Sequence, residues 1–259
     1  MATMTHSATM FRRNLRRAAR YPSMTIGVAL VPVIMLLLFS YLFGNAMSAG
    51  VGASSGGLSY IDFLLPGILL MTLGSSSTAT AVSVCNDVAD GIVARFRTMP
   101  ITRTSVLTGQ VLGSVVQTMV SVVLVVAVGL ALGFRPSAGP VEWLLAVGLM
   151  VLAAFGITWL AVALGMTSKL PEGASNAVMP LSFFLPFLSS AFIPLETLPS
   201  GIRWFAEYQP FTALIETLRG LLVGGPIGDN GWLAVGWSVV MIAGGYLWAR
   251  SIFNRDPGR

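Results

Sequence analysis

Long runs without charged residues make up most of the chain, and short charged segments separate them. A helix of about 20 apolar residues crosses the roughly 30 Å hydrocarbon core of a bilayer, so each such run is a candidate membrane span. The fifth run is interrupted by Pro180, Pro186 and Pro194, so we expect that span to be kinked or to end early. The pattern predicts six transmembrane helices, at about residues 24–43, 63–84, 105–134, 143–168, 173–195 and 232–250.

Composition supports a membrane protein. The chain has 259 residues, of which 55% are hydrophobic and only 10% charged, whereas a soluble domain carries about 25% charged residues. The loops between the predicted spans are short. We therefore expect an all-α, polytopic membrane protein whose residues 1–259 form a single transmembrane domain.

Basic residues are distributed unevenly between the two sides that six crossings define. One side would hold Arg135, Arg203 and Arg219. The other would hold twelve basic residues, namely Arg12, Arg13, Arg16, Arg17, Arg20, Arg95, Arg97, Arg103, Lys169, Arg250, Arg255 and Arg259. By the positive-inside rule the larger group is cytoplasmic. The net charge of +5 thus indicates membrane orientation rather than nucleic-acid binding, and it predicts that both termini are cytoplasmic.

Two basic segments lie on the predicted cytoplasmic side. Residues 10–21, MFRRNLRRAARY, are typical of an amphipathic helix lying along the inner leaflet, although a charge cluster that only sets topology has the same composition. A signal peptide fits poorly because the apolar run that follows is longer than the usual 7–15 residues. The second segment, Asn86–Thr104, lies between two uncharged runs, so it must be in water, where another protein can contact it.

The second predicted span contains GSSSTATA at residues 74–81, which is unusually polar for a helix in contact with lipid. Small residues allow helices to approach closely, and hydroxyls form hydrogen bonds across helix interfaces. The stretch therefore predicts either tight helix packing or a stripe that contacts substrate.

Two short helices are expected between the fifth and sixth spans. Ser200 starts one that contains Trp204, Phe205 and Tyr208, and Phe211–Leu222 form another, with Glu216 and Arg219 one turn apart. Neither is long enough to cross a bilayer. They form either a re-entrant hairpin in the outer leaflet or a loop lying flat outside it.

The residues that would supply chemistry or energy are scarce. His6 and Cys85 are single, so neither predicts a metal site or a disulfide. The chain contains no G-x-x-x-x-G-K-[ST] loop for nucleotide phosphates, and the six predicted spans lack Asp, Glu and His. An ion-coupled carrier with a sodium site built from hydroxyls and carbonyls remains an alternative. Otherwise a separate soluble subunit must supply the energy.

One catalytic alternative comes from the charged segment. Asp87-x-x-Asp90-Gly91-x-x-Ala94-Arg95 resembles the first half of the signature of membrane CDP-alcohol phosphotransferases, which hold divalent metals with carboxylates. The later glycine and two aspartate positions are occupied by Thr104, Thr108 and Leu112. Half of that metal site is therefore missing from the sequence.

Nearly the whole chain resembles the ABC-2 type permeases, the membrane subunits of bacterial ATP-binding-cassette exporters, and in particular their daunorubicin-resistance-like branch. Three segments carry the resemblance: FRRNLRRAARYP, DGIVARFRTMPITRTSVLTGQ and FFLPFLSSAFIPLETLPSGIRWFAEYQPFTALIETLRGLL. The last is the most specific, because its proline, aromatic and Glu-x-x-Arg spacing follows the family closely. The middle one departs from it at Asp90-Gly91, where relatives often have a glutamate before the glycine.

The resemblance implies a transport subunit of the bacterial plasma membrane without enzymatic activity. It pairs with a second six-span subunit, as a homodimer or paralogous heterodimer, above two ATP-binding subunits. This chain then needs no cofactor, and ATP and Mg act in the partner. Expected cargo is an amphipathic drug, as in multidrug efflux and antibiotic resistance, or a lipid, although other family members move polysaccharides, sodium or heme-related cargo.

The resemblance also assigns roles to individual residues. The coupling helix that docks on the ATPase corresponds to Asp90, Gly91, Arg95, Phe96, Arg97, Thr98, Met99 and Pro100. The interfacial helix beside it corresponds to Phe11, Arg12, Arg13, Arg16, Arg17 and Arg20. The re-entrant helices that close the outer side correspond to Trp204, Phe205, Tyr208, Pro210, Phe211, Glu216 and Arg219.

Overall fold

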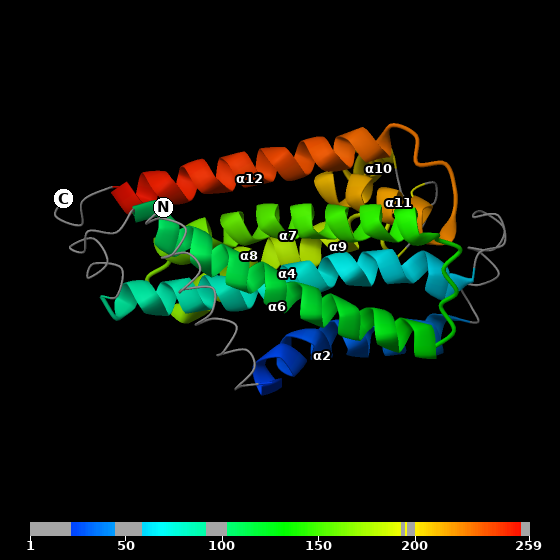
Figure 1. Ribbon diagram of the computed structural model, residues 1–259, viewed down its shortest axis with the longest axis horizontal. Coiled ribbons are helices and arrows are strands. Elements are labelled where there is room, and N and C mark those ends of the chain that lie inside the picture. Colours follow the sequence, from blue (N-terminus) through cyan, green and yellow to red (C-terminus); the bar gives the residue numbers. More distant parts are fainter. Residues whose placement is uncertain (1–21, 45–58, 92–102, 193–194, 196–199, 255–259) are drawn as a thin grey trace.

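The computed structural model describes residues 22–44, 59–91, 103–192, 195 and 200–254. Within these residues all regular structure is helical, which confirms the predicted all-α class. The elements are α2 (Pro22–Leu38), the π-helical turn η1 (Phe39–Phe43), α4 (Tyr60–Ala89), α6 (Arg103–Ala131), α7 (Pro140–Thr167), α8 (Pro171–Met179), the π-helical turn η2 (Pro180–Phe184), α9 (Leu185–Phe187), α10 (Ser200–Tyr208), α11 (Pro210–Val223) and α12 (Asn230–Asn254) (Figure 1).

The long helices run side by side along the long axis of the molecule (Figure 1). α4 is the central one: 72% of its most apolar window is buried, against 39% for α6 and 28% for α12. α10 and α11 lie at one end of this bundle, the end at which α4 and α7 begin. The position of α4 explains why the sequence of this helix is rich in small residues.

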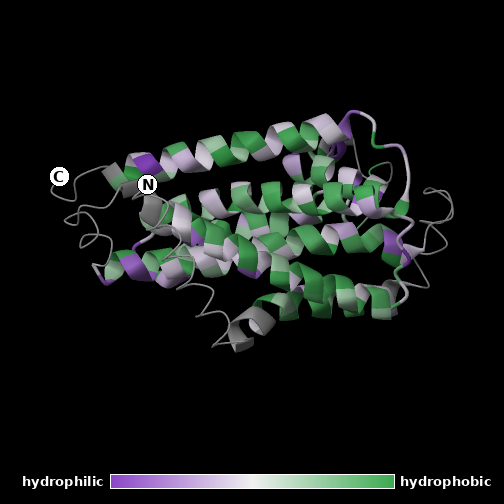
Figure 2. Ribbon diagram, viewed as in Figure 1, coloured by the Kyte–Doolittle hydropathy of each residue, from purple (hydrophilic) through white to green (hydrophobic). Residues whose placement is uncertain are grey.

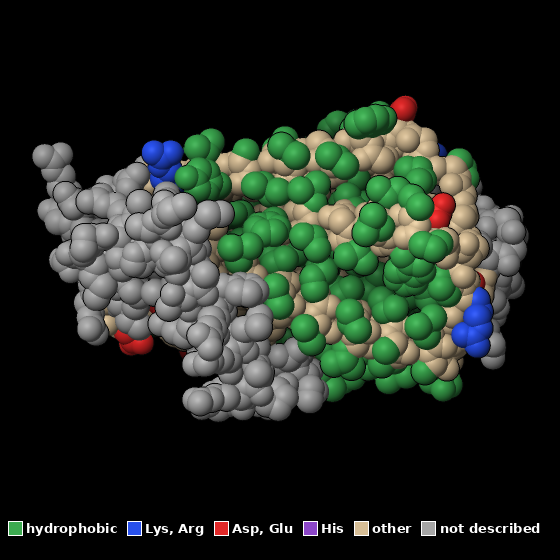
Figure 3. All heavy atoms as spheres, viewed as in Figure 1, with side chains coloured by type: hydrophobic (Ala, Val, Ile, Leu, Met, Phe, Trp, Pro, Cys, Tyr) green, Lys and Arg blue, Asp and Glu red, His purple; other side chains and the backbone are tan. Residues whose placement is uncertain are grey.

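Among the residues that the structure describes, four helices are long and apolar enough to cross a membrane, at Tyr60–Ala89, Leu107–Ala131, Pro140–Thr167 and Asn230–Phe253. Figure 2 shows hydrophobic residues along the middle of the bundle and hydrophilic ones gathered toward its ends. The face shown in Figure 3 carries a broad apolar surface, with charged side chains near its margins. This distribution is the one expected of a protein embedded in a bilayer.

The first and fifth predicted spans are not among these four helices, because the described helices in both regions are shorter. The apolar helix in the first region covers Gly27–Leu42. In the fifth region the chain forms three short consecutive segments, α8, η2 and α9. Pro180 is the first residue of η2, and Pro186 lies in the first turn of α9. Proline lacks the N–H that continues an α-helical ladder, and the π-helical turn accommodates the break. The predicted interruption of this span is therefore confirmed.

Glycines allow α4 and its neighbours to approach closely. A Cβ atom built on Gly74 would lie 2.6 Å from the Cα of Ser182 in η2, and one built on Gly67 would lie 2.5 Å from the Cβ of Ala191. On α7, Gly165 packs against the backbone of Ala81 in the same way. Close backbone approach through small residues, predicted for residues 74–81, is thus confirmed.

Two of the predicted cytoplasmic features fall largely outside the described residues. The basic helix from Phe11 to Arg20 and the segment from Arg95 to Pro100 belong to this group. Asp90 and Gly91 are described. Asp90 ends α4, and Gly91 follows with a φ of 70°, a left-handed conformation that glycine adopts without steric cost.

Candidate functional site

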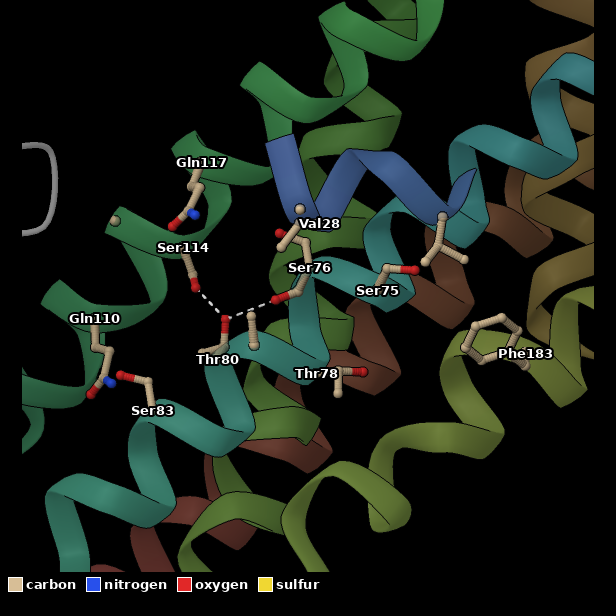
Figure 4. Close-up of a pocket in the computed structure, with 14 residues that line it drawn as sticks. Val28, Ser75, Ser76, Thr78, Thr80, Ser83, Gln110, Ser114, Gln117 and Phe183 are labelled. Carbon is tan, nitrogen blue, oxygen red and sulfur yellow. Dashed lines mark hydrogen bonds between the residues drawn. The ribbon is translucent and has the colours of Figure 1, made fainter. Parts of the chain in front are cut away.

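A cavity of about 460 Å³ lies between α2, α4, α6 and η2. Figure 4 shows side chains of all four elements around it. Its lining consists of Gly27, Val28, Val31, Ser75, Ser76, Thr78, Ala79, Thr80, Ser83, Gln110, Gly113, Ser114, Gln117 and Phe183.

The spacing of the polar residues explains the polar wall of the cavity. Ser76, Thr80 and Ser83 recur every three or four positions along α4, as Gln110, Ser114 and Gln117 do along α6. Residues at that spacing share one face of a helix. Two polar faces therefore meet, and the hydrophobic side chains of Val28, Val31 and Phe183 complete the lining.

Some of these polar side chains form hydrogen bonds between helices. The hydroxyl of Thr118 donates to Ser76 Oγ at 2.6 Å, and the hydroxyls of Thr80 and Ser114, which point toward one another in Figure 4, are hydrogen-bonded. Thr78 and Ser182 are bonded at 2.9 Å, which joins α4 to η2. The packing role predicted for residues 74–81 is confirmed at these positions.

The rest of the polar surface faces the cavity. The hydroxyl oxygen of Ser75 is buried and has no hydrogen-bond partner in the described chain. Gln110 Nε2 donates to Asp87 Oδ2 at 3.4 Å, toward the end of α4. None of the described lining residues carries a formal charge. The cavity can therefore offer neutral donors and acceptors to a ligand, but no ionic partner.

A second polar centre lies at the other end of α4 and is organised by Arg219, which is only 8% exposed. Its Nη2 donates to the backbone oxygens of Phe63, at 3.1 Å, and Ser190, at 2.8 Å. Its Nη1 donates to Glu216 Oε1 at 2.6 Å, and the guanidinium carbon lies 3.8 Å from the centre of the Phe63 ring. Arg219 thus connects α11 to the first turn of α4 and to the segment after α9.

Two opposing effects act on the charge of the Arg219 guanidinium. α11 lies outside the four candidate spans, and burial lowers the pKa of Arg219 from its ordinary value. The nearby carboxylate of Glu216 acts in the opposite direction, as does the hydrogen bond between the two side chains. The predicted contact of Glu216 and Arg219 one turn apart is confirmed, whereas no sequence pattern identified the two carbonyl acceptors.

The aromatic residues of the two short helices separate into two groups. Phe211 is fully buried, while Trp204, Phe205 and Tyr208 are exposed on α10. Between the helices, the buried side chain of Gln209 donates through Nε2 to the oxygen of Leu188 at 2.5 Å. The predicted pair of short helices is confirmed, with Pro210 at the start of the second.

The described residues contain no cluster of three or more His, Cys, Asp or Glu side chains that would hold a metal ion. Cys85 is buried, and its Sγ lies 3.4 Å from the oxygen of Ser168. Asp90 lies at the C-terminal end of α4, one turn beyond Asp87. Within the described residues, no further carboxylates join Asp87 and Asp90 to complete the metal site of the phosphotransferases.

Comparison with known proteins decides between the alternatives. The family described as ABC-2 type transporter matches residues 5–223. The chain belongs to this family. The resemblance inferred from three sequence segments is thereby confirmed.

Three individual relatives are themselves named as permeases. The chain is 30% identical over 223 residues to the daunorubicin resistance ABC transporter permease protein DrrB1 of Streptomyces coeruleorubidus, covering 86% of this chain and 75% of that one. It is 27% identical over 217 residues to the probable doxorubicin resistance ABC transporter permease protein DrrC of Mycobacterium tuberculosis, covering 83% and 76%. The inner membrane transport permease YadH of Escherichia coli is 24% identical over 246 residues, 92% of each chain.

The cavity-lining residues of α6 and η2 were not predicted from the sequence. Gln110, Ser114 and Gln117 recur at helical spacing within an otherwise apolar run, which is a usable indication of a polar helix face. Phe183 gave no such indication, because only the fold brings η2 against α4.

Proposed function

We propose that this chain is the permease subunit of an ATP-binding-cassette exporter and carries an amphipathic, drug-like or lipid molecule out of a bacterial cell. The match to the ABC-2 type transporter family over residues 5–223 is the observation on which the proposal rests. Two relatives named as daunorubicin and doxorubicin resistance permeases support the substrate class. The subunit has a transport role, and ATP with Mg acts in the partner.

The topology has six crossings of the plasma membrane, with both termini in the cytoplasm. α2 and η1, with 17 and 5 residues, form the first crossing, because together they extend about 33 Å at 1.5 Å per residue. α8, η2 and α9 form the proline-broken fifth crossing, and the exposed side chains of Met179, Phe184 and Phe187 support contact with lipid there. The excess of basic residues on one side supports the orientation.

Coupling to the ATPase takes place at Asp90–Pro100, with Arg95, Phe96 and Arg97 as the main contact and the basic helix from Phe11 to Arg20 beside it. The segment containing these residues lies between α4 and α6 in the sequence, and both helices line the cavity. Hydroxyl pairs such as Thr80 and Ser114 connect the same two helices. A displacement of this segment by the ATPase therefore acts directly on the walls of the cavity.

The complete transporter contains two permease subunits and two ATP-binding subunits. α10 and α11 form a re-entrant pair that closes the pathway on the outer side, with Trp204, Phe205 and Tyr208 toward the membrane and Phe211 toward the protein interior. ATP binding draws the ATPase subunits together and shifts the permease pair between conformations. The buried position of Arg219 supports this closing role, since it fastens α11 to α4.

Replacing Arg95, Phe96 and Arg97 together by alanine tests the proposal. We expect loss of ATP-dependent drug uptake into inside-out vesicles and loss of copurification with the ATPase, because a central aromatic residue and its arginines dominate such contacts. The matched control is Arg255→Ala with Arg259→Ala, which removes two charges from the same side of the membrane. Unchanged uptake in the triple variant would contradict the proposed coupling, and uptake by this chain without any ATPase would contradict the proposed function.

A further inference from the structure

We propose that the cavity between α2, α4, α6 and η2 binds the uncharged, hydrogen-bonding part of an amphipathic molecule. The inference rests on the proposed export function and adds to it a location and a recognition chemistry. Neutral dipoles of hydroxyls and carboxamides, rather than ion pairs, select the cargo at this position.

The lining of the cavity has hydrogen-bonding capacity that the described chain leaves unused. Ser75 Oγ is inaccessible to solvent and has no partner in the described chain. The side chains of Ser83 and Gln117 also line the cavity, and they form no hydrogen bond with any residue that the structure describes. Buried polar groups are usually paired, so the Ser75 hydroxyl needs a partner that the described chain does not supply, whereas the half-buried side chains of Ser83 and Gln117 stay available to bond a ligand.

The described lining of the cavity is uncharged. The described lining contains hydroxyls, carboxamides and apolar groups, but no carboxylate, ammonium or guanidinium group. A charge placed within a membrane is costly unless a partner of opposite sign compensates it. Any charged group of the bound molecule must consequently remain outside the cavity, while its hydroxyl, carbonyl or ether groups enter.

The walls of the cavity have an arrangement and a size that suit a small amphipathic molecule. The polar side chains come from α4 and α6, and Val28, Val31 and Phe183 add an apolar surface from α2 and η2. The volume of about 460 Å³ lies in the range of small-molecule pockets, about 300–1,000 Å³. A drug-sized molecule with one polar edge and one apolar edge matches these walls.

The test measures binding to the purified full chain in lipid nanodiscs without ATPase. The probes are daunorubicin, whose sugar carries an amine, and its uncharged aglycone, both followed by their intrinsic fluorescence. We expect the aglycone to bind within about threefold of daunorubicin, because the cavity does not use the charge. Gln117→Leu, which keeps the side-chain size, and Ser75→Ala are each expected to weaken the binding of both probes about tenfold.

The matched control is Ser238→Ala in α12, since Ser238 is fully buried but bonds only to Ala234 of its own helix. Binding to this variant should equal that of the unmodified chain. If Gln117→Leu does not fold, Ser75→Ala and Ser83→Ala carry the test, because each removes only one hydroxyl.

Three results would overturn the assignment. They are wild-type affinity in the cavity variants, binding of daunorubicin but not of its aglycone, and failure of both probes to bind the unmodified chain. ATP-driven export is measured separately with the ATPase present. If export persists despite one of these results, the proposed function stands and only the proposed binding site is refuted.

Discussion

The two ends of α4 are held by different kinds of contact. At its first turn, the oxygen of Phe63 accepts hydrogen bonds from a single buried cation, Arg219, which also bonds Ser190 and Glu216. From Ser75 onward, neutral hydroxyls and small residues make the contacts and a cavity is left. α4 is thus held strongly at its first turn, whereas from Ser75 onward its contacts are weaker hydrogen bonds that can change partners.

This difference agrees with the needs of a transporter. Hydrogen bonds between hydroxyls in membrane proteins contribute about 0.6–2 kcal/mol each, so α4 and α6 can change partners at low cost. Breaking the Arg219 centre costs more, because it leaves the buried oxygens of Phe63 and Ser190 without a donor, and each unsatisfied buried group costs about 1–3 kcal/mol. We therefore expect movement to begin at the hydroxyl-lined part, with the Arg219 centre opening last.

The largest effect is expected for Arg219→Ala. The substitution leaves the oxygens of Phe63 and Ser190 without their donor and Glu216 without its partner. We expect the free energy of unfolding to fall by about 3–5 kcal/mol, measured by denaturant titration in mild detergent. Arg203→Ala is the control, because Arg203 is exposed on α10; a loss of equal size in both variants would refute the special role of Arg219.

Gly74→Val is expected to have the next largest effect. A Cβ at this position would lie 2.6 Å from the Cα of Ser182, so α4 and η2 must separate. Overpacking of this kind costs about 1–3 kcal/mol, measurable as a lower midpoint of thermal unfolding. Gly148→Val on α7 introduces the same side chain where no atom lies within 4 Å. Equal midpoints for the two variants would contradict the close contact.

A smaller effect is expected for Thr118→Val, which keeps the shape of the side chain but removes the hydroxyl that donates to Ser76. The expected loss is about 0.6–2 kcal/mol in the same unfolding titration. Thr167→Val serves as the control, because the Thr167 hydroxyl bonds only to Leu164 of its own helix and is exposed. A Thr118 variant as stable as the control would show that the α4–α6 hydroxyl bonds do not stabilise the fold.

The smallest change in stability is expected for Ser75→Ala. Its hydroxyl has no partner in the described chain, so its removal should leave the free energy of unfolding unchanged or raise it by up to about 1 kcal/mol. Unfolding titrations on wild type and variant, without ligand, make the comparison. A clear loss of stability would mean that Ser75 serves packing rather than the cavity.

Residues 74–81 illustrate how far a sequence pattern can be read. Their composition raised two alternatives, packing and contact with substrate. The structure assigns Gly74, Ser76 and Thr80 to helix contacts, and the unpartnered Ser75 to the cavity. Composition alone does not separate these roles, because the direction in which each side chain points depends on the neighbouring helices.

The pair Glu216 and Arg219 illustrates the same limit near the first turn of α4. Their spacing predicts contact within one helix, because residues three apart share a face. The bonds from Arg219 to Phe63 and Ser190 connect residues 156 and 29 positions away in the chain. Such acceptors are backbone oxygens, which every residue carries, so no residue type marks them in advance.

By itself, the sequence determined that the chain is helical and membrane-embedded, and three of its segments were sufficient to recognise its family. Those properties follow from the local content of apolar residues, charges and prolines, which hold whatever the neighbouring segments are. Only the tertiary structure decided that α4 is central, that Arg219 bonds to its first turn, and that α2, α6 and η2 enclose a cavity beside it. These features depend on which helix faces meet, and packing between segments distant in sequence selects that arrangement.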